Sequence, residues 1–134
     1  MTTFIDTSAF LATLDRADRT HAAAAAVWTR FRDQDELLVT SNYILIETSA
    51  LVQRRLGLDA LDALTRRFLP LVEVHWVEPL EHQTALEMVL TAARRDLSLV
   101  DCTSLLLMRH RAIPTAFAFD RHFAEQGFQV IPQA

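Results

Sequence analysis

The sequence has no lysine, two glycines and one cysteine, and each shortage excludes a class of protein. Without lysine there is neither a lysine nucleophile nor a Schiff base. Gly57 and Gly127 alone cannot build a glycine-rich phosphate-binding loop. The single Cys102 allows no intrachain disulfide, which favours a reducing compartment. No apolar run approaches the roughly 18 residues of a membrane span and the N-terminus lacks a basic signal segment, so we expect a cytoplasmic protein with no membrane contact.

The composition is that of one globular domain over residues 1–134. Hydrophobic residues make up 51% of the chain and charged residues 22%, which is enough to build an ample core. All 13 basic residues are arginine and 17 residues are acidic, which gives a net charge of −4. This balance excludes a broadly basic nucleic-acid coat, although the three pairs at 54–55, 66–67 and 94–95 leave room for a local basic surface.

Short β-type segments alternate with amphipathic helical segments along the chain. Strands are expected over residues 2–6, 37–40, 72–77, 115–119 and 129–131, and helices over 9–14, 18–32, 43–56, 58–69, 80–95 and 99–111. This order predicts an α/β fold with a short parallel β-sheet flanked by helices on both faces. In such sheets ligands bind at the carboxyl ends of the strands. Asp6 and Asp120, which end predicted strands, are therefore candidate site residues, although a helix N-cap or a turn would also explain each of them.

Glu47 lies in the apolar segment YILIETSALV without a partner at helical spacing. Its same-face neighbours include Tyr43 and Leu51, and no cation is among them. Acids are rarely buried unless they are paired or bind metal. Glu47 is therefore a candidate ligand, and the alternative is a glutamate at the boundary of the core whose carboxylate reaches solvent.

Asp101 lies between apolar residues in LSLVDCTSLLLM. Ser98 and Asp101 fit a capping box at the start of a helix, which is a sufficient structural explanation. A capping role leaves a functional role open, because the first turn of a helix is exposed at one end.

If Asp6, Glu47, Asp101 and Asp120 converge, they require a cation. Two unit charges about 5 Å apart repel by about 3 kcal/mol at an effective dielectric constant near 20. Several such pairs would rival the roughly 5–15 kcal/mol stability of a typical domain. The carboxylates must then take up protons or bind metal, and a set of oxygen ligands selects Mg²⁺ or Mn²⁺ over Zn²⁺.

The segments FIDTSAFLATLD, SNYILIETSALVQRRLG, LSLVDCTSLLLMRH and IPTAFAFDRHF together resemble the PIN-domain ribonucleases, and most of all the VapC-type toxins of bacterial toxin–antitoxin pairs. The resemblance extends over essentially the whole chain. It implies a PIN-like fold, usually dimeric, and a metal-dependent endoribonuclease that cleaves structured RNA such as tRNA or rRNA. It also implies a cognate antitoxin as partner and assigns Asp6, Glu47, Asp101 and Asp120 to the metal site. The family often has Thr-x-Asp at the last acid, whereas this chain has Ala118 two residues before Asp120.

The other candidate residues have simpler explanations. The five histidines, at 21, 75, 82, 110 and 122, form no H-x-x-x-H pair and so predict no zinc site. Cys102, Trp28 and Trp76 are expected to pack in the core or at an interface, although the tryptophans could also stack on bases. The hydroxyls and backbone N–H groups of Thr7 and Ser8, at the start of a helix, could orient water or phosphate.

The sequence therefore predicts a Mg²⁺- or Mn²⁺-dependent endoribonuclease that acts as the toxin of a toxin–antitoxin pair. Two other hypotheses remain open at this point. One is a non-catalytic protein-interaction module on the same fold, and the other is a metal-dependent DNA nuclease or phosphatase. We also expect a homodimer, because the predicted helix 58–69 carries apolar residues at 58, 61, 64 and 68 along one side.

Overall fold

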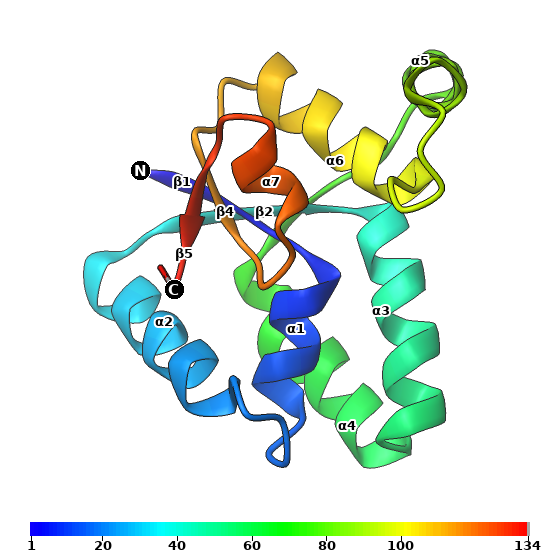
Figure 1. Ribbon diagram of the computed structural model, residues 1–134. Helices are drawn as coiled ribbons and strands as arrows, with labels where there is room; N and C mark the ends of the chain where they lie inside the picture. Colours follow the sequence, from blue (N-terminus) through cyan, green and yellow to red (C-terminus); the bar gives the residue numbers. More distant parts are fainter. Residues whose placement is uncertain (134) are drawn as a thin grey trace.

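Five short parallel strands form the centre of the protein in the computed structural model, which describes residues 1–133 (Figure 1). The strands are β1 (Thr2–Ile5), β2 (Leu37–Ser41), β3 (Glu73–His75), β4 (Thr115–Phe117) and β5 (Gln129–Ile131). They lie in the order β3-β2-β1-β4-β5 and every neighbouring pair is parallel. The α/β fold with a short parallel sheet is thereby confirmed.

The helices divide between the two faces of the sheet according to the direction in which the chain moves. The connections β1–β2 and β2–β3 move one way across the sheet, and β3–β4 and β4–β5 move the other way. Right-handed crossovers therefore place the first four helices on one face and the last three on the other, as Figure 1 shows. The first group is α1 (Thr7–Leu14), α2 (His21–Gln34), α3 (Asn42–Arg55) and α4 (Leu58–Ala63), and the second is α5 (Pro79–Ala92), α6 (Leu99–His110) and α7 (His122–Glu125).

The direction of winding reverses between β1 and β4, which are neighbours in the sheet. The helix after β1 packs on one face and the helix after β4 on the other, so a crevice opens where these two strands end. The chain also places both predicted strand-end acids at this point.

Large apolar side chains fill both sides of the sheet. The side chains of Phe4, Ile5 and Phe117, on β1 and β4, are completely buried. Trp28 on α2 packs edge-on against Phe117, with ring centroids 6.0 Å apart, and its indole N–H donates to the Thr13 hydroxyl. Trp28 therefore packs against the core, whereas 67% of the surface of Trp76 is exposed.

The predicted helix 58–69 is shorter in the structure. Regular α-helix ends at Ala63, and a π-helical turn (Leu64–Phe68) and a 3₁₀ turn (Leu69–Leu71) follow. Pro70, within the 3₁₀ turn, has no N–H to donate and its ring crowds the preceding turn, so regular α-helix does not continue through it. Leu64 is completely buried, and the side chains at 61 and 68 also pack against the core. The apolar side that we expected to meet a partner is thus largely used by the protein's own core.

Two further differences affect the region around the site. The second helix begins at His21 rather than near residue 18, because Asp18 accepts hydrogen bonds from the Thr20 N–H and hydroxyl in the preceding turn. The short helix α7 was not expected from the sequence.

Over residues 1–133 no helix is both long and apolar enough to cross a membrane.

Candidate active site

Asp6 and Asp120 lie side by side at the carboxyl edge of the sheet because β1 and β4 are neighbours. Ile5 and Phe117, the last residues of the two strands, are paired in register. The Asp6 N–H then donates to the Phe117 carbonyl oxygen at 3.1 Å, which extends the pairing by one more bond. Parallel pairing therefore brings together two acids that are 114 positions apart in the sequence.

Asp6 is the N-cap of α1, as its alternative explanation predicted, and it is also buried at the site. Its Oδ2 accepts hydrogen bonds from the Ser8 hydroxyl at 2.6 Å and from the Ser8 N–H at 3.2 Å. The Ser8 hydroxyl oxygen in turn accepts from the Phe119 N–H at 2.9 Å. Ser8 therefore ties the start of α1 to the segment after β4, and its polar groups hold Asp6 instead of pointing to an incoming phosphate.

The Asp6 carboxyl is electrostatically strained. Its pKa is raised from 3.8 to about 6: burial is the largest cause, the hydrogen bonds from Ser8 oppose it, and the negative charges of Asp101 and Asp120 add smaller increases. Asp6, Asp101 and Asp120 are therefore close enough to repel one another, as the convergence argument required.

Asp101 belongs to the predicted capping box and also faces the crevice. Its Oδ2 accepts from the Ser98 N–H at 2.9 Å, and its own N–H donates to the Ser98 hydroxyl at 3.1 Å. The box fixes the carboxylate in the first turn of α6, with 18% of its side chain exposed. The capping role and a functional role are thus compatible.

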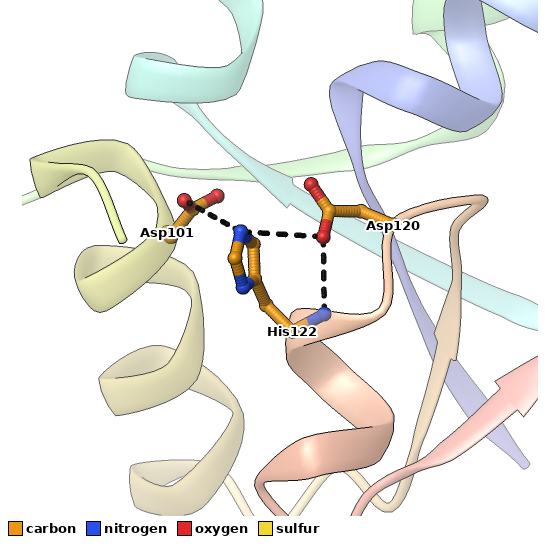
Figure 2. A group of neighbouring side chains, drawn as sticks. All are labelled: Asp101, Asp120 and His122. Carbon is orange, nitrogen blue, oxygen red and sulfur yellow. Dashed lines mark hydrogen bonds and ion pairs between the residues drawn. The ribbon is translucent and has the colours of Figure 1, made fainter. Parts of the chain in front are cut away.

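The structure adds a histidine to the acids that the sequence singled out. His122, at the start of α7, lies between Asp101 and Asp120 (Figure 2). Its Nε2 is 3.6 Å from Asp101 Oδ2 and 3.4 Å from Asp120 Oδ1, and its backbone N–H donates to Asp120 Oδ1 at 3.0 Å. One potential ligand atom from each of the three residues lies within 4.8 Å of the others.

Sequence reasoning missed His122 because it searched for pairs of histidines. The available signal was different: His122 follows a strand-end acid by two positions, at the beginning of a new element. In this place the backbone N–H caps onto Asp120 and turns the ring back toward the crevice.

Glu47 is half-buried on α3 and does not belong to the group formed by Asp101, Asp120 and His122. The next residue, Thr48, donates its hydroxyl hydrogen to the Thr7 hydroxyl oxygen at 3.1 Å. This bond joins the middle of α3 to the first turn of α1, so Glu47 lies on a helix that packs beside Asp6. Its participation in the site remains a prediction.

An open groove of about 630 Å³ begins at Asp120. Its walls are mostly apolar and include Phe119 and Val130, and the exposed Arg121 lies at its edge. Ala118, the residue that departs from Thr-x-Asp, also lines the groove and is itself buried.

The donor atoms fit a divalent cation. Two carboxylates and an imidazole converge at a sheet edge, and a third carboxylate has its pKa raised partly by their negative charge. A cation at this point would relieve that repulsion, and carboxylates are the usual ligands of Mg²⁺ and Mn²⁺.

The chain is similar to known proteins over most of its length. A curated relative, the "23S rRNA-specific endonuclease VapC20" of Mycobacterium tuberculosis, is 34% identical over 126 residues, which cover 93% of this chain and 94% of the relative. The crystal structure of VapC20, described as a "Sarcin-Ricin loop cleaving toxin", superposes with a TM-score of 0.84 at 33% identity and 96% coverage of both chains.

Two more distant structures share the fold alone. FitAcB from Neisseria gonorrhoeae has a TM-score of 0.67 at 15% identity, covering 97% of this chain and 96% of that one. VapBC2 from Rickettsia felis, bound to a DNA fragment from its promoter, has a TM-score of 0.66 at 9% identity and 97% coverage of both. The sequence model of the PIN-domain family matches residues 3–129, so this chain belongs to the PIN-domain family.

Proposed function

We propose that this protein is a divalent-metal-dependent endoribonuclease of the VapC type, the toxin of a toxin–antitoxin pair, and that it cleaves structured RNA. The observation that carries the proposal is that Asp101 and Asp120 converge at the carboxyl edge of the sheet, close enough to the buried Asp6 for their charges to raise its pKa. The similarity to VapC20 supports RNA, and rRNA in particular, as the substrate class, with tRNA as the other structured candidate.

We assign Asp6, Glu47, Asp101 and Asp120 to the catalytic site as the residues that would hold Mg²⁺ or Mn²⁺, directly or through water. A bound divalent cation supplies charge stabilisation at the scissile phosphate and a more acidic water nucleophile. The chain's own contribution is to fix the carboxylates before the reaction: Ser8 holds Asp6, and the capping box holds Asp101. Preorganised groups of this kind need little rearrangement at the moment of reaction.

The groove beside Asp120 supports an extended polynucleotide substrate. Its apolar walls can accept a base next to the scissile phosphate, and Arg121 is placed to contact a neighbouring phosphate. Without a cation the three acids would repel RNA, so metal binding and substrate binding are coupled in this scheme.

We further propose that residues 1–134 act as one domain in the cytoplasm, as a homodimer inhibited by a cognate antitoxin. Because the side chains at 61, 64 and 68 pack against the core and Leu58 alone of the four is exposed, we propose that the dimer surface lies around α5. Its large exposed apolar side chains are Trp76, Leu80, Leu86 and Leu90. A soluble domain gains by covering an apolar patch of this kind.

The test is incubation of purified protein with total RNA and, separately, with single- and double-stranded DNA, each with Mn²⁺ and with EDTA. We expect Mn²⁺-dependent cleavage of RNA that Asp6→Asn abolishes. Cleavage of DNA alone would support the DNA nuclease hypothesis instead. Cleavage of neither polymer by correctly folded protein, with Mn²⁺ present and the antitoxin absent, would favour a non-catalytic interaction module.

A further inference from the structure

We propose that His122 is a direct ligand of the cation, through Nε2, beside Asp101 and Asp120, and that it makes the site prefer Mn²⁺ over Mg²⁺. The inference rests on the proposed metal-dependent function and adds a residue and a metal preference to it. It follows from the position of the ring, from its distances to the carboxylates and from the absence, within residues 1–133, of any other hydrogen bond to the ring nitrogens.

The ring of His122 is deeply buried and directed into the acidic cluster. Only 9% of its side chain is exposed, and Figure 2 shows the ring inserted between the two carboxylates with Nε2 toward both. Nδ1 is buried and has no hydrogen-bond partner in residues 1–133. An ordinary core histidine is fixed by hydrogen bonds from its ring, whereas here the polar neighbours of the ring are the carboxylates themselves.

The distances from Nε2 to the two carboxylates are longer than a close hydrogen bond and leave room for an ion between the three groups. A charge-assisted N–H···O bond has its heavy atoms about 2.7–2.9 Å apart. Nε2 lies 3.4 Å from Asp120 Oδ1 and 3.6 Å from Asp101 Oδ2. Two ligand atoms bonded at about 2.1 Å to one ion lie about 3.0 Å apart at octahedral angles and about 3.4 Å apart at tetrahedral angles. The separations of 3.4 and 3.6 Å lie between the values for adjacent octahedral ligands and for opposite ones, about 4.2 Å, and all three ligand atoms lie within 4.8 Å of one another, so small side-chain movements would let them share one ion.

A nitrogen ligand changes which ion the site selects. Mg²⁺ is a hard cation that is bound almost entirely by oxygen, while imidazole is a good ligand for first-row transition ions. Two carboxylates alone would discriminate little between Mg²⁺ and Mn²⁺. Adding His122 therefore favours Mn²⁺. Its removal should weaken the binding of Mn²⁺ more than it weakens the binding of Mg²⁺.

The first measurement needs no variant. Mn²⁺ is bound to the wild-type protein and examined by pulsed electron paramagnetic resonance, which detects nitrogen nuclei bonded to the ion. We expect a ¹⁴N modulation that is replaced by a ¹⁵N signal when the protein is prepared with ¹⁵N-histidine. Bound Mn²⁺ without a histidine signal would overturn the role of His122 and leave the proposed function intact, while failure to bind Mn²⁺ would contradict the proposed function itself.

The second measurement assigns the nitrogen. His122→Gln is compared with His110→Gln, which changes an exposed histidine in the last turn of the same helix as Asp101. We expect His122→Gln to lose the nitrogen signal and to lower the ratio of Mn²⁺ to Mg²⁺ affinity, measured by calorimetry, by about 10-fold or more. His110→Gln should change neither. An unchanged or increased Mn²⁺ affinity in folded His122→Gln would show that His122 only pairs with the acids and would refute the proposal.

Discussion

Replacing Asp6 by Asn should stabilise the metal-free protein at neutral pH, although it removes a residue of the proposed site. The Asp6 carboxyl has a pKa raised from 3.8 to about 6, chiefly by burial. This difference of about two pH units corresponds to about 3 kcal/mol. The folded state binds the Asp6 proton more tightly than the unfolded state does. The stability that this proton contributes is therefore complete below about pH 4 and is lost as the pH rises through 6. At pH 7.5 the whole deficit is present.

The Asn side chain cannot ionise, and its amide oxygen can still accept from Ser8. In EDTA at pH 7.5 we therefore expect Asp6→Asn to unfold at a higher temperature than wild type. The gain has an upper limit of about 3 kcal/mol, or about 10 °C in Tm for a chain of this length. At pH 4 the two proteins should unfold at nearly the same temperature, because Asp6 is then protonated. Thermal unfolding followed by circular dichroism at both pH values is the assay.

Asp18→Asn provides a control of opposite sign. The hydrogen bonds from Thr20 lower the pKa of Asp18, so its stabilising contribution is present at neutral pH and is lost on acidification. This variant should be less stable than wild type at pH 7.5. If Asp6→Asn also unfolds at a lower temperature than wild type in EDTA at pH 7.5, the buried Asp6 carboxylate does not destabilise the metal-free fold and this prediction is wrong.

Five further variants test the proposed site and the proposed dimer surface separately. Asp101→Asn should abolish RNA cleavage with little change in Tm, because the amide still caps the helix. Ser98→Ala should lower the free energy of unfolding by about 1 kcal/mol and keep cleavage. The opposite pattern would show that Asp101 only caps the helix. Ser8→Ala should lower the free energy of unfolding by about 1–3 kcal/mol and slow cleavage, and wild-type rates would show that Ser8 does not position Asp6. Glu47→Gln should slow cleavage without destabilising the fold, and an unchanged rate would remove Glu47 from the site. Leu90→Glu should convert a dimer to a monomer in light scattering at micromolar concentration, and an unchanged mass would move the dimer surface elsewhere.

The sequence was sufficient to predict the sheet and the acids at its edge. Alternating strand and helix segments require parallel pairing, and parallel strands end at the same edge, so Asp6 and Asp120 could be placed at the same edge of the sheet, although not side by side. Asp101 could be predicted because its apolar surroundings made an acid unusual there. The capping box was a competing explanation for Asp101 in the sequence. In the structure its hydrogen bond from the Ser98 N–H fixes the position of the Asp101 carboxylate.

Other features depend on contacts that local patterns do not contain. His122 meets Asp101 only because α7 folds back against the start of α6, and a helix as short as α7 has no recognisable periodicity. The end of α4 at Ala63 could not be predicted from apolar spacing, since that spacing continues through Leu64 into the π-helical turn. The position of Glu47 relative to the other acids depends on how α3 packs against α1, a contact between side chains 41 residues apart.

In the proposed function, the acids at the ends of β1 and β4 form a metal-dependent centre for RNA cleavage. The most direct test is a single-turnover assay on purified 23S rRNA, with wild type and Asp120→Asn compared in Mn²⁺ and in EDTA and the new ends mapped by primer extension. We predict cleavage at a defined position by wild type with Mn²⁺, and a rate at least about 100-fold lower in Asp120→Asn or in EDTA. Equal cleavage by Asp120→Asn, or by wild type in EDTA, would contradict the account.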